Sequence, residues 1–531
     1  MPWFVFAYLI AWITRNAMGV KPQMYSTAPR GPSRRAFLLT GALAAGGMML
    51  TACGRDADSD TFTAAFQGSG AAEGIDPGVN TLFIDEARMK AVYDGLFEVD
   101  DTMTPVPRLA VSAEPNADGT RWRIALREAR WHDGSAFTAD DVLFTIARVL
   151  GPPQRRPFIA ATTLDQVDLP QCRAVDARTV EIALKRPSFE FLTALSAYGT
   201  KIVRNGTTDF TRPVGTGPFA FESFQAGREF TGRANEHYWD GAPAMRRLRI
   251  LGAEPDARLA AVQSGQIDYA DNLTPSAART LTGRRGVTLE STPDSGIYFF
   301  AMKTDRPPFD NPAVRRAVMH MTDRAELVRV ALEGQGQVGN DVFGKGYRYY
   351  ADLPQHEYDP DEVGRLLRGA GIRDLSFELF TAQVGYGFVE AARLFAEHAA
   401  ACGVHVEVVL GSKDSYYTDA LETGHLTMGQ SGPLAIPNHF ASRLLTGAPQ
   451  NRTKFSDPEF DALYLRAQAT PSADARAAIY RTMHEIQYDR GGFVFFGNAD
   501  WNSAARDSYA NVPAAVPNSH RWARFDTVSA R

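Results

Sequence analysis

Residues 107–149 read PRLAVSAEPNADGTRWRIALREARWHDGSAFTADDVLFTIARV, and they indicate a strand, a turn and a capped helix in succession. In the segment 121–127, Trp, Ile and Leu alternate with arginines, a period of two that predicts a strand with one apolar face. Asp133-Gly134 predicts a turn, because glycine accepts positive φ without steric cost. Thr138 can then cap a helix, with Asp141 at the third helical position of a capping box. The apolar side of that helix should consist of Val142, Leu143, Ile146, Val149 and Leu150.

The whole chain has the size and composition of a multidomain globular protein. It has 531 residues, of which 44% are hydrophobic and 22% charged, and at about 100–200 residues per domain it should hold two to four domains. A net charge of -5 gives no footprint for nucleic-acid binding. Cys53, Cys172 and Cys402 lack the spacing of a zinc site or a disulfide framework. One disulfide between Cys172 and Cys402 remains open if the compartment is oxidising.

The N-terminal part of the chain predicts export and lipid anchoring. Ser33–Leu38 (SRRAFL) matches the twin-arginine export motif, and the apolar run 38–50 has the length of a signal peptide rather than of a membrane span. The run ends in Leu-Thr-Ala-Cys53, which is similar to a bacterial lipobox and implies diacylation of the Cys53 thiol. The alternative is a plain cleaved signal with an incidental cysteine. Residues 1–52 are therefore excluded from the fold, and translation could start at Met1 or at Met24.

Motifs spread along the chain resemble one protein family. The matching segments are Pro107–Ser112, Asp118–Trp122, Trp131–Gly134, Phe137–Arg148, Val214–Phe219, Asn235–Pro243, Leu259–Asp268 and Pro307–Ala317. Together they resemble the bacterial extracellular solute-binding proteins of family 5, the peptide/nickel class that includes oligopeptide- and dipeptide-binding proteins. The resemblance covers about residues 61–522, nearly all of the expected mature chain.

This resemblance implies a bilobal α/β fold of the periplasmic-binding-protein type (class II, cluster C) with an extra inserted subdomain. After a short tether, 53–60, lobe I would comprise 61–96, 206–296 and 495–531. The inserted subdomain would be 97–205, and lobe II would be 297–494.

Motifs that would indicate catalysis lack their structural context. Gly334–Gly339 reads G-x-G-x-x-G but follows a helical segment instead of a strand, so we expect a flexible loop without a dinucleotide. Gly429–Gly432 is similar to a nucleophile elbow, but Pro433 replaces its second glycine. His484-Glu485 lacks the second histidine of a zincin helix. We therefore expect a non-enzyme with no catalytic residue, no cofactor and no metal site.

The resemblance implies a ligand enclosed between two closing lobes. The ligand-binding residues carried over from the family are Phe83, Asp294, Tyr298, Phe300, Thr381, Tyr386, Gln430 and Ser431. Aromatic rings at these positions could stack on a ligand, although core packing is an equal alternative for Tyr298 and Phe300.

One departure from the family concerns the segment 428–437, MGQSGPLAIP. Peptide-binding members have G-W-x-x-D-Y there, and its Asp pairs with the free amine of the peptide. An ammonium group in a closed, dry cleft is costly without a countercharge, which makes a peptide anchored by its α-amine doubtful. Asp294 could supply the charge instead. Heme, nickel chelates, opines, glycans and modified peptides all remain open as ligands.

The predicted function is that of a substrate-binding component of an ABC importer. We expect a monomer that is held outside the cytoplasmic membrane by a lipid on Cys53. It would capture a peptide-like or other mid-sized polar solute and deliver it to the permease subunits. Two alternatives stay open, a ligand-binding sensor or chaperone on the same fold and a secreted hydrolase.

Overall fold

The computed structural model describes residues 60–68, 73–79, 82–151, 158–413 and 415–531. These residues belong to one unit that spans Asp56–Arg531. The expected signal region 1–52, the lipidation site Cys53 and the tether up to residue 59 lie outside the described residues. Within the described ranges, no helix is both long and apolar enough to cross a membrane.

A large mixed sheet contains two long strands at its centre. β12 (Val287–Met302) and β17 (Phe493–Arg506) pair antiparallel, and β13 (Gly336–Val338) also pairs with β17. The strand order is β15-β14-β16-β12-β17-β11-β1-β10-β9-β8. On the β12 side lie β16 (Leu426–Ser431), β14 (Ser376–Thr381) and β15 (His405–Leu410). On the β17 side lie β11 (Tyr269–Leu273), β1 (Thr61–Phe66), β10 (Arg247–Gly252), β9 (Glu229–Ala234) and β8 (Phe219–Gln225).

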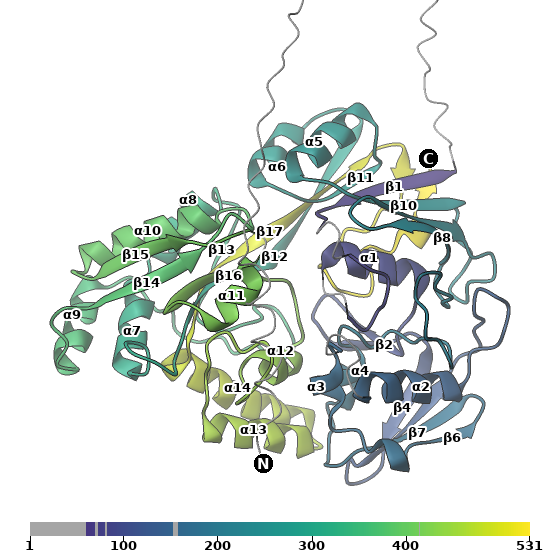
Figure 1. Ribbon diagram of the computed structural model, residues 1–531, viewed down its shortest axis with the longest axis horizontal. Helices are drawn as coiled ribbons and strands as arrows, with labels where there is room; N and C mark the ends of the chain where they lie inside the picture. Colours follow the sequence, from purple (N-terminus) through teal and green to yellow (C-terminus); the bar gives the residue numbers. More distant parts are fainter. Residues whose placement is uncertain (1–59, 69–72, 80–81, 152–157, 414) are drawn as a thin grey trace, which may run out of the picture. The chain divides into compact units, whose positions relative to one another are not determined.

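β12 and β17 join the two groups of strands (Figure 1). The pairing between β12 and β17 is interrupted within this link. The β12–β17 register shifts between Thr292 and Gly296, and again between Tyr298 and Phe299. Asp294 has a φ of 56° at the first shift, a left-handed conformation that few non-glycine residues adopt. Before the shift β12 pairs with β17, and after it β12 also pairs with β16. The link between the two groups of strands is therefore an irregular part of the sheet.

Residues 107–149 contribute two strands and a helix to a separate four-stranded sheet. The order is β4 (Ala110–Pro115), β5 (Arg121–Leu126), β7 (Thr179–Ala183) and β6 (Arg173–Asp176). α2 (Ala139–Leu150) packs on it, and the Asp141 carboxylate accepts a hydrogen bond from the Thr138 backbone N–H at 2.8 Å. The predicted strand, capping box and helix are confirmed. Beside them lie β2 (Phe97–Val99), β3 (Pro105–Pro107), α3 (Ala161–Leu164) and α4 (Phe191–Leu195).

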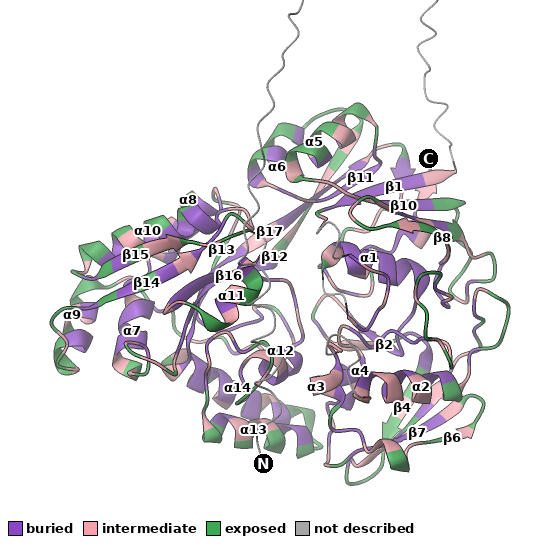
Figure 2. Cartoon of the chain, in the orientation of Figure 1, coloured by how far each residue is buried: buried purple, intermediate pink, exposed green. Residues whose placement is uncertain are grey.

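Three helices begin with an Asx cap and a proline, as their sequences predict. α7 (Pro312–His320), α9 (Pro360–Gly369) and α13 (Pro458–Ala469) start after Asn311, Asp359 and Asp457, whose side chains accept hydrogen bonds from first-turn N–H groups. The other helices are α1 (Phe83–Val92), α5 (Pro255–Ser264), α6 (Pro275–Leu281), α8 (Arg324–Ala331), α10 (Phe388–Ala401), α11 (Tyr416–Glu422), α12 (Ile436–Arg443) and α14 (Ala473–Arg490). Outward faces of α9, α10 and α13 are exposed, whereas β16 and the first half of β17 are buried (Figure 2).

The buried apolar residues form several separate clusters. One lies under α7, α8, α10 and the second half of β12, and another under α1, β1, β10 and the C-terminal residues 505–528. A third is confined to residues 96–202, close to the expected inserted subdomain. The lobe boundaries given above stay a prediction.

Two local expectations need correction, and one open alternative is resolved. The sequence predicts a helix over Ala87–Leu96, but α1 spans Phe83–Val92, so its first turn starts four residues earlier. Part of the expected loop Gly334–Gly339 is the strand β13, because the absence of a Cβ at Gly336 lets its backbone approach β17; an added Cβ would lie 2.5 Å from the Asn498 carbonyl oxygen. Cys172 and Cys402 are both free thiols, so they do not pair.

Candidate functional site

A cavity of about 1540 Å³, here called the main cavity, is the candidate site. Its walls come from elements on both sides of the β12–β17 link, including α1, the loop after β11, the loop before α10, and the segment from β16 to Arg452. Pockets for small molecules commonly have volumes of about 300–1,000 Å³. The main cavity exceeds that range and can therefore hold a mid-sized organic molecule.

Aromatic side chains form one wall of the main cavity. The Phe83 ring lies 4.5 Å from that of Trp501 and 5.6 Å from that of Trp522, measured between centroids. Phe83 also touches the backbone of the segment after β16, because a Cβ added to Gly432 would lie 2.6 Å from Phe83 Cζ. This wall thus joins the start of α1 to the end of β16, and it depends on a glycine at 432.

The structure brings five of the eight predicted ligand-binding residues to the main cavity. These five are Phe83, Tyr298, Tyr386, Gln430 and Ser431. Tyr298 is mostly buried and packs against Phe388 and Phe496, so its core packing is observed, and stacking on a ligand stays a prediction. A ligand-binding role for the five stays a prediction.

The other three predicted residues do not line the main cavity. Phe300 is fully buried against Phe395 and Phe496, which agrees with its core-packing alternative. The buried Thr381 hydroxyl donates to the Phe388 carbonyl oxygen at 3.2 Å. Asp294 is half-buried at the irregularity of β12, where burial raises the pKa of its carboxyl. Tyr298 and Phe300 are two residues apart on β12, so their side chains share one face of the sheet and one core cluster, and Phe300 is the more deeply buried of the two.

Acidic side chains of the main cavity have different partners. Asp271 accepts hydrogen bonds from Trp501 Nε1 and the Tyr269 hydroxyl, both at 3.1 Å, and burial raises its pKa to about 6. The exposed Glu254 lies 4.0 Å from Lys413. Glu390 and Asp500 also line the cavity, and neither forms an ion pair among the described residues.

Within the described part of the chain, two arginines of the main cavity have guanidinium groups that bond neither a carboxylate nor a carbonyl oxygen. Arg443, the last residue of α12, donates from Nη1 to the Ser431 hydroxyl oxygen at 2.6 Å. Arg452 follows in the next loop, with its guanidinium carbon 5.6 Å from the centre of the Tyr417 ring. Burial, and then the charge of Arg452, lowers the pKa of Arg443 to about 10. Arg443 and Arg452 are called the arginine pair below.

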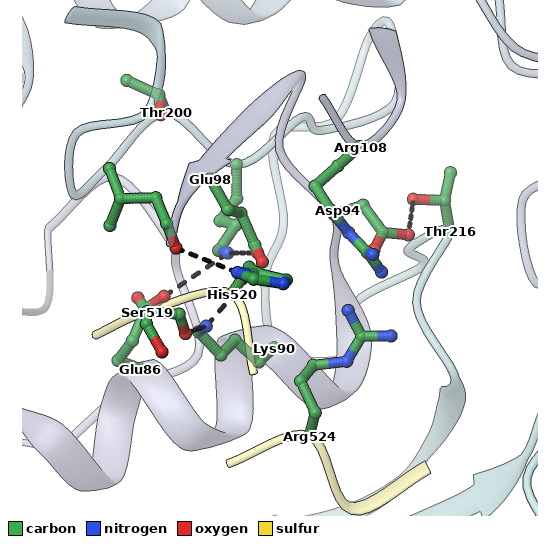
Figure 3. A network of polar contacts seen from close by, with 12 residues as sticks. Glu86, Lys90, Asp94, Glu98, Arg108, Thr200, Thr216, Ser519, His520 and Arg524 are labelled. Atoms are coloured by element: carbon green, nitrogen blue, oxygen red, sulfur yellow. Dashed lines mark hydrogen bonds and ion pairs between the residues drawn. The ribbon is translucent and has the colours of Figure 1, made fainter. Parts of the chain in front are cut away.

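A second, small cavity of about 40 Å³ adjoins the main cavity and shares Tyr198 and Asn438 with it. Its charged walls form the Glu98 network, which consists of Glu86, Lys90, Glu98 and Lys201 (Figure 3). Lys201 Nζ contacts Glu98 Oε1 closely and lies 3.4 Å from Glu86 Oε1, and Lys90 Nζ lies 3.8 Å from Glu98 Oε2. The space is sufficient for only a few water molecules.

The charges of the Glu98 network compensate one another. Burial alone would raise the pKa of Glu98, but the charges of Lys201 and Lys90 hold it well below its ordinary value. Burial lowers the pKa of Lys90 to about 8, with Glu98 opposing that shift. Lys90 also donates to the Ser519 carbonyl oxygen at 2.5 Å. The network therefore fixes α1 to β2 and to the C-terminal segment.

One group of side chains has metal-ligating composition. Asp323, Glu326 and His398 offer ligand atoms within 4.8 Å of one another. Asp323 caps α8 by accepting from the Glu326 backbone N–H at 2.8 Å, and His398 Nε2 lies 3.0 Å from Glu326 Oε2. Because these atoms already bond one another, we interpret the group as a contact between α8 and α10.

Comparison with known proteins identifies the family. The model of "Bacterial extracellular solute-binding proteins, family 5 Middle" matches residues 104–451. The chain belongs to this family. Family 5 consists of binding proteins, and the expectations of family and of a bilobal α/β fold are confirmed.

Two curated family 5 relatives and one solved structure illustrate the likeness. Heme-binding protein A of Haemophilus influenzae is 27% identical over 451 residues, covering 77% of this chain and 82% of that protein. The dipeptide-binding protein of Escherichia coli is 24% identical over 485 residues, covering 84% and 90%. NikZ from Campylobacter jejuni, solved in complex with Ni(L-His), shares the fold with a TM-score of 0.78 at 21% identity, covering 89% and 99%.

The family resemblance did not point to several residues of the main cavity. Tyr198, Trp501 and Asp271 line it, as does the arginine pair. Trp501 and Asp271 lie on β17 and β11, where only the pairing of distant strands brings them together. Arg443 in the sequence looks like an ordinary cation in a last helical turn, a position that favours basic residues in any helix.

Proposed function

We propose that this family 5 protein is the substrate-binding component of an ABC importer, which captures a peptide-like or other mid-sized polar solute and delivers it to the permease. The observation that carries the proposal is the main cavity of about 1540 Å³, whose walls come from both sides of the β12–β17 link. Closure about that link would bury the guest, and the closed form would be the state that the permease recognises. The guest leaves chemically unchanged.

The proposal includes the cellular setting expected from the sequence. The protein is exported, Cys53 carries the lipid that holds it at the outer face of the cytoplasmic membrane, and it works as a monomer. Lobe I comprises 61–96, 206–296 and 495–531, the inserted subdomain 97–205, and lobe II 297–494. Two acyl chains give stable anchoring where one gives only marginal membrane affinity.

The cargo is not held by the usual amine anchor. Gln430 and Ser431 occupy the segment where peptide-binding relatives have their amine-binding Asp, and both are neutral. If the cargo carries an ammonium group, Glu390 or Asp500 is the better countercharge, because each lines the main cavity without an ion pair among the described residues. A buried ammonium group requires such a partner.

Native mass spectrometry of the purified protein tests the proposal. We expect a small molecule to co-purify, to be released unchanged on denaturation, and to reduce the radius of gyration in small-angle scattering when it is added back. A protein that carries no compound and whose scattering is indifferent to nutrient extracts would contradict it. Release of a hydrolysed compound would favour the hydrolase alternative.

A further inference from the structure

The strongest unexplained feature of the main cavity is the arginine pair. Most other buried or half-buried arginines of the described chain have a carboxylate or several carbonyl partners. Arg324 contacts Asp341, and Arg476 donates to Glu190 at 2.8 Å. Arg258, in the same cavity, donates to the carbonyl oxygens of Ala253 and Asn272 at 2.6 and 3.0 Å. The half-buried Arg127 donates to one carbonyl oxygen, of Arg108, and stacks on Trp239 outside the main cavity.

The arginine pair departs from that rule in the wall of a cavity. Arg443 has one neutral partner, the Ser431 hydroxyl, and Arg452 Nη1 is buried without a hydrogen-bond partner among the described residues. A buried guanidinium nitrogen without a hydrogen-bond partner costs free energy, and so does a desolvated guanidinium group without a countercharge. We therefore expect Arg443 and Arg452 to find their partner in a molecule that enters the main cavity.

The surroundings keep the arginine pair in place. Ser431 accepts from Arg443 and donates its own hydrogen to the Gly432 carbonyl oxygen at 2.8 Å, which fixes the guanidinium at the end of β16. The Arg452 carbonyl oxygen accepts from Lys303 Nζ at 2.6 Å, so the backbone of that loop is anchored too. Lys303 donates only to carbonyl oxygens, and burial, followed by the charges of Lys454 and Arg452, lowers its pKa to about 7.

We propose that the arginine pair is an oxyanion-binding subsite, so that the solute carries a carboxylate or phosphate group that docks on Arg443 and Arg452. Guanidinium groups present several N–H donors in a plane, which matches the oxygens of these anions. The inference rests on the proposed solute capture and specifies its cargo. Ser431, which sequence comparison suggested as a direct ligand contact, then acts as the positioning residue for Arg443.

Isothermal titration calorimetry with defined probes tests this subsite. The probes are citrate for carboxylates, inorganic phosphate for phosphates, and trimethyl citrate as the neutral analogue, each at 20 and 300 mM NaCl. We expect at least one anion to bind, more weakly at high salt, and trimethyl citrate not to bind. Arg443→Met and Arg452→Met should each weaken binding about tenfold or more, whereas Arg443→Lys should retain part of it, because it keeps the charge.

Lys413→Met is the matched control, since it removes one positive charge from the same cavity outside the arginine pair. Its affinity should stay within about twofold of the wild type, because an exposed charge is screened by solvent. Unchanged affinity in Arg443→Met and Arg452→Met, an equal loss in Lys413→Met, or no binding of either anion by the wild type would overturn the subsite. Co-purification of a neutral compound alone would also overturn it, yet solute capture would stand.

Discussion

The Glu98 network and the arginine pair both place charge in buried surroundings, but only the network contains both signs. In the network, Lys90 and Lys201 share the carboxylate of Glu98, and Glu86 adds a second negative charge (Figure 3). In the arginine pair, neither guanidinium group forms an ion pair among the described residues, although acidic side chains line other parts of the main cavity. The two regions are neighbours, because the small cavity and the main cavity share wall residues.

This difference separates charge used for folding from charge used for binding. Removing one member of a compensated buried group leaves its partner uncompensated, and this is strongly destabilising. Removing a charge that has no partner relieves an electrostatic cost, so stability should stay or rise while binding is lost. The predictions below test this contrast in order of expected effect on the free energy of unfolding.

Glu98→Gln should have the largest effect. It leaves Lys90 and Lys201 buried in the presence of Glu86 alone, and breaking a buried pair in this way costs about 3–5 kcal/mol. Urea denaturation followed by circular dichroism measures the change. Glu254→Gln, which removes an exposed carboxylate beside Lys413, is the control and should cost well under about 1 kcal/mol. If both variants lose equally little, the Glu98 network does not stabilise the fold.

Asp271→Asn tests a third situation, a buried carboxylate held by neutral donors. Its folded pKa of about 6 lies above the ordinary 3.8, so the native protein keeps a proton that the unfolded chain has lost between these values. Wild-type stability should therefore fall as the pH rises from about 4 to 6, by roughly 3 kcal/mol relative to Asp271→Asn. Denaturation curves of both proteins across this range give the difference. A difference that does not vary with pH would show that Asp271 is not shifted.

The sequence predicts elements whose signals are local. The strand at 121–126, the capping box of Thr138 and Asp141, and the starts of α7, α9 and α13 are all encoded by neighbouring residues. The apolar run Tyr298–Met302 predicts a buried strand, whereas β12 begins at Val287, because its first half is polar and partly exposed and gives no such signal. β13 was missed for a related reason, since its strand character comes from close approach to β17 and not from its own residues.

The candidate site was less predictable because its charges acquire meaning only through tertiary contacts. The family resemblance correctly pointed to Tyr298, Tyr386 and Gln430 as residues that line the main cavity. They lie on β12, in the loop before α10 and on β16. No sequence pattern distinguishes Arg443, which lacks an acidic partner, from Arg324, which contacts Asp341. Whether the charge of an arginine is neutralised by a carboxylate depends on residues distant in the chain. Arg324 and Arg443 differ in this respect only in the folded structure.

Arg443→Met should have the smallest effect on stability. It gives the most direct comparison between the arginine pair and a charged group of the fold interior. Methionine keeps the apolar stem but removes a desolvated charge that burial and Arg452 disfavour, so the free energy of unfolding should stay constant or rise by up to about 1 kcal/mol. Arg324→Met is the matched variant from the fold interior. It leaves the buried carboxylate of Asp341 without its arginine and with His356 as its remaining side-chain partner, and a loss of about 3–5 kcal/mol is expected. Urea denaturation at pH 7 measures the free energy of unfolding of both variants. If both lose equal stability, Arg443 stabilises the fold and its guanidinium group is not kept for binding a solute.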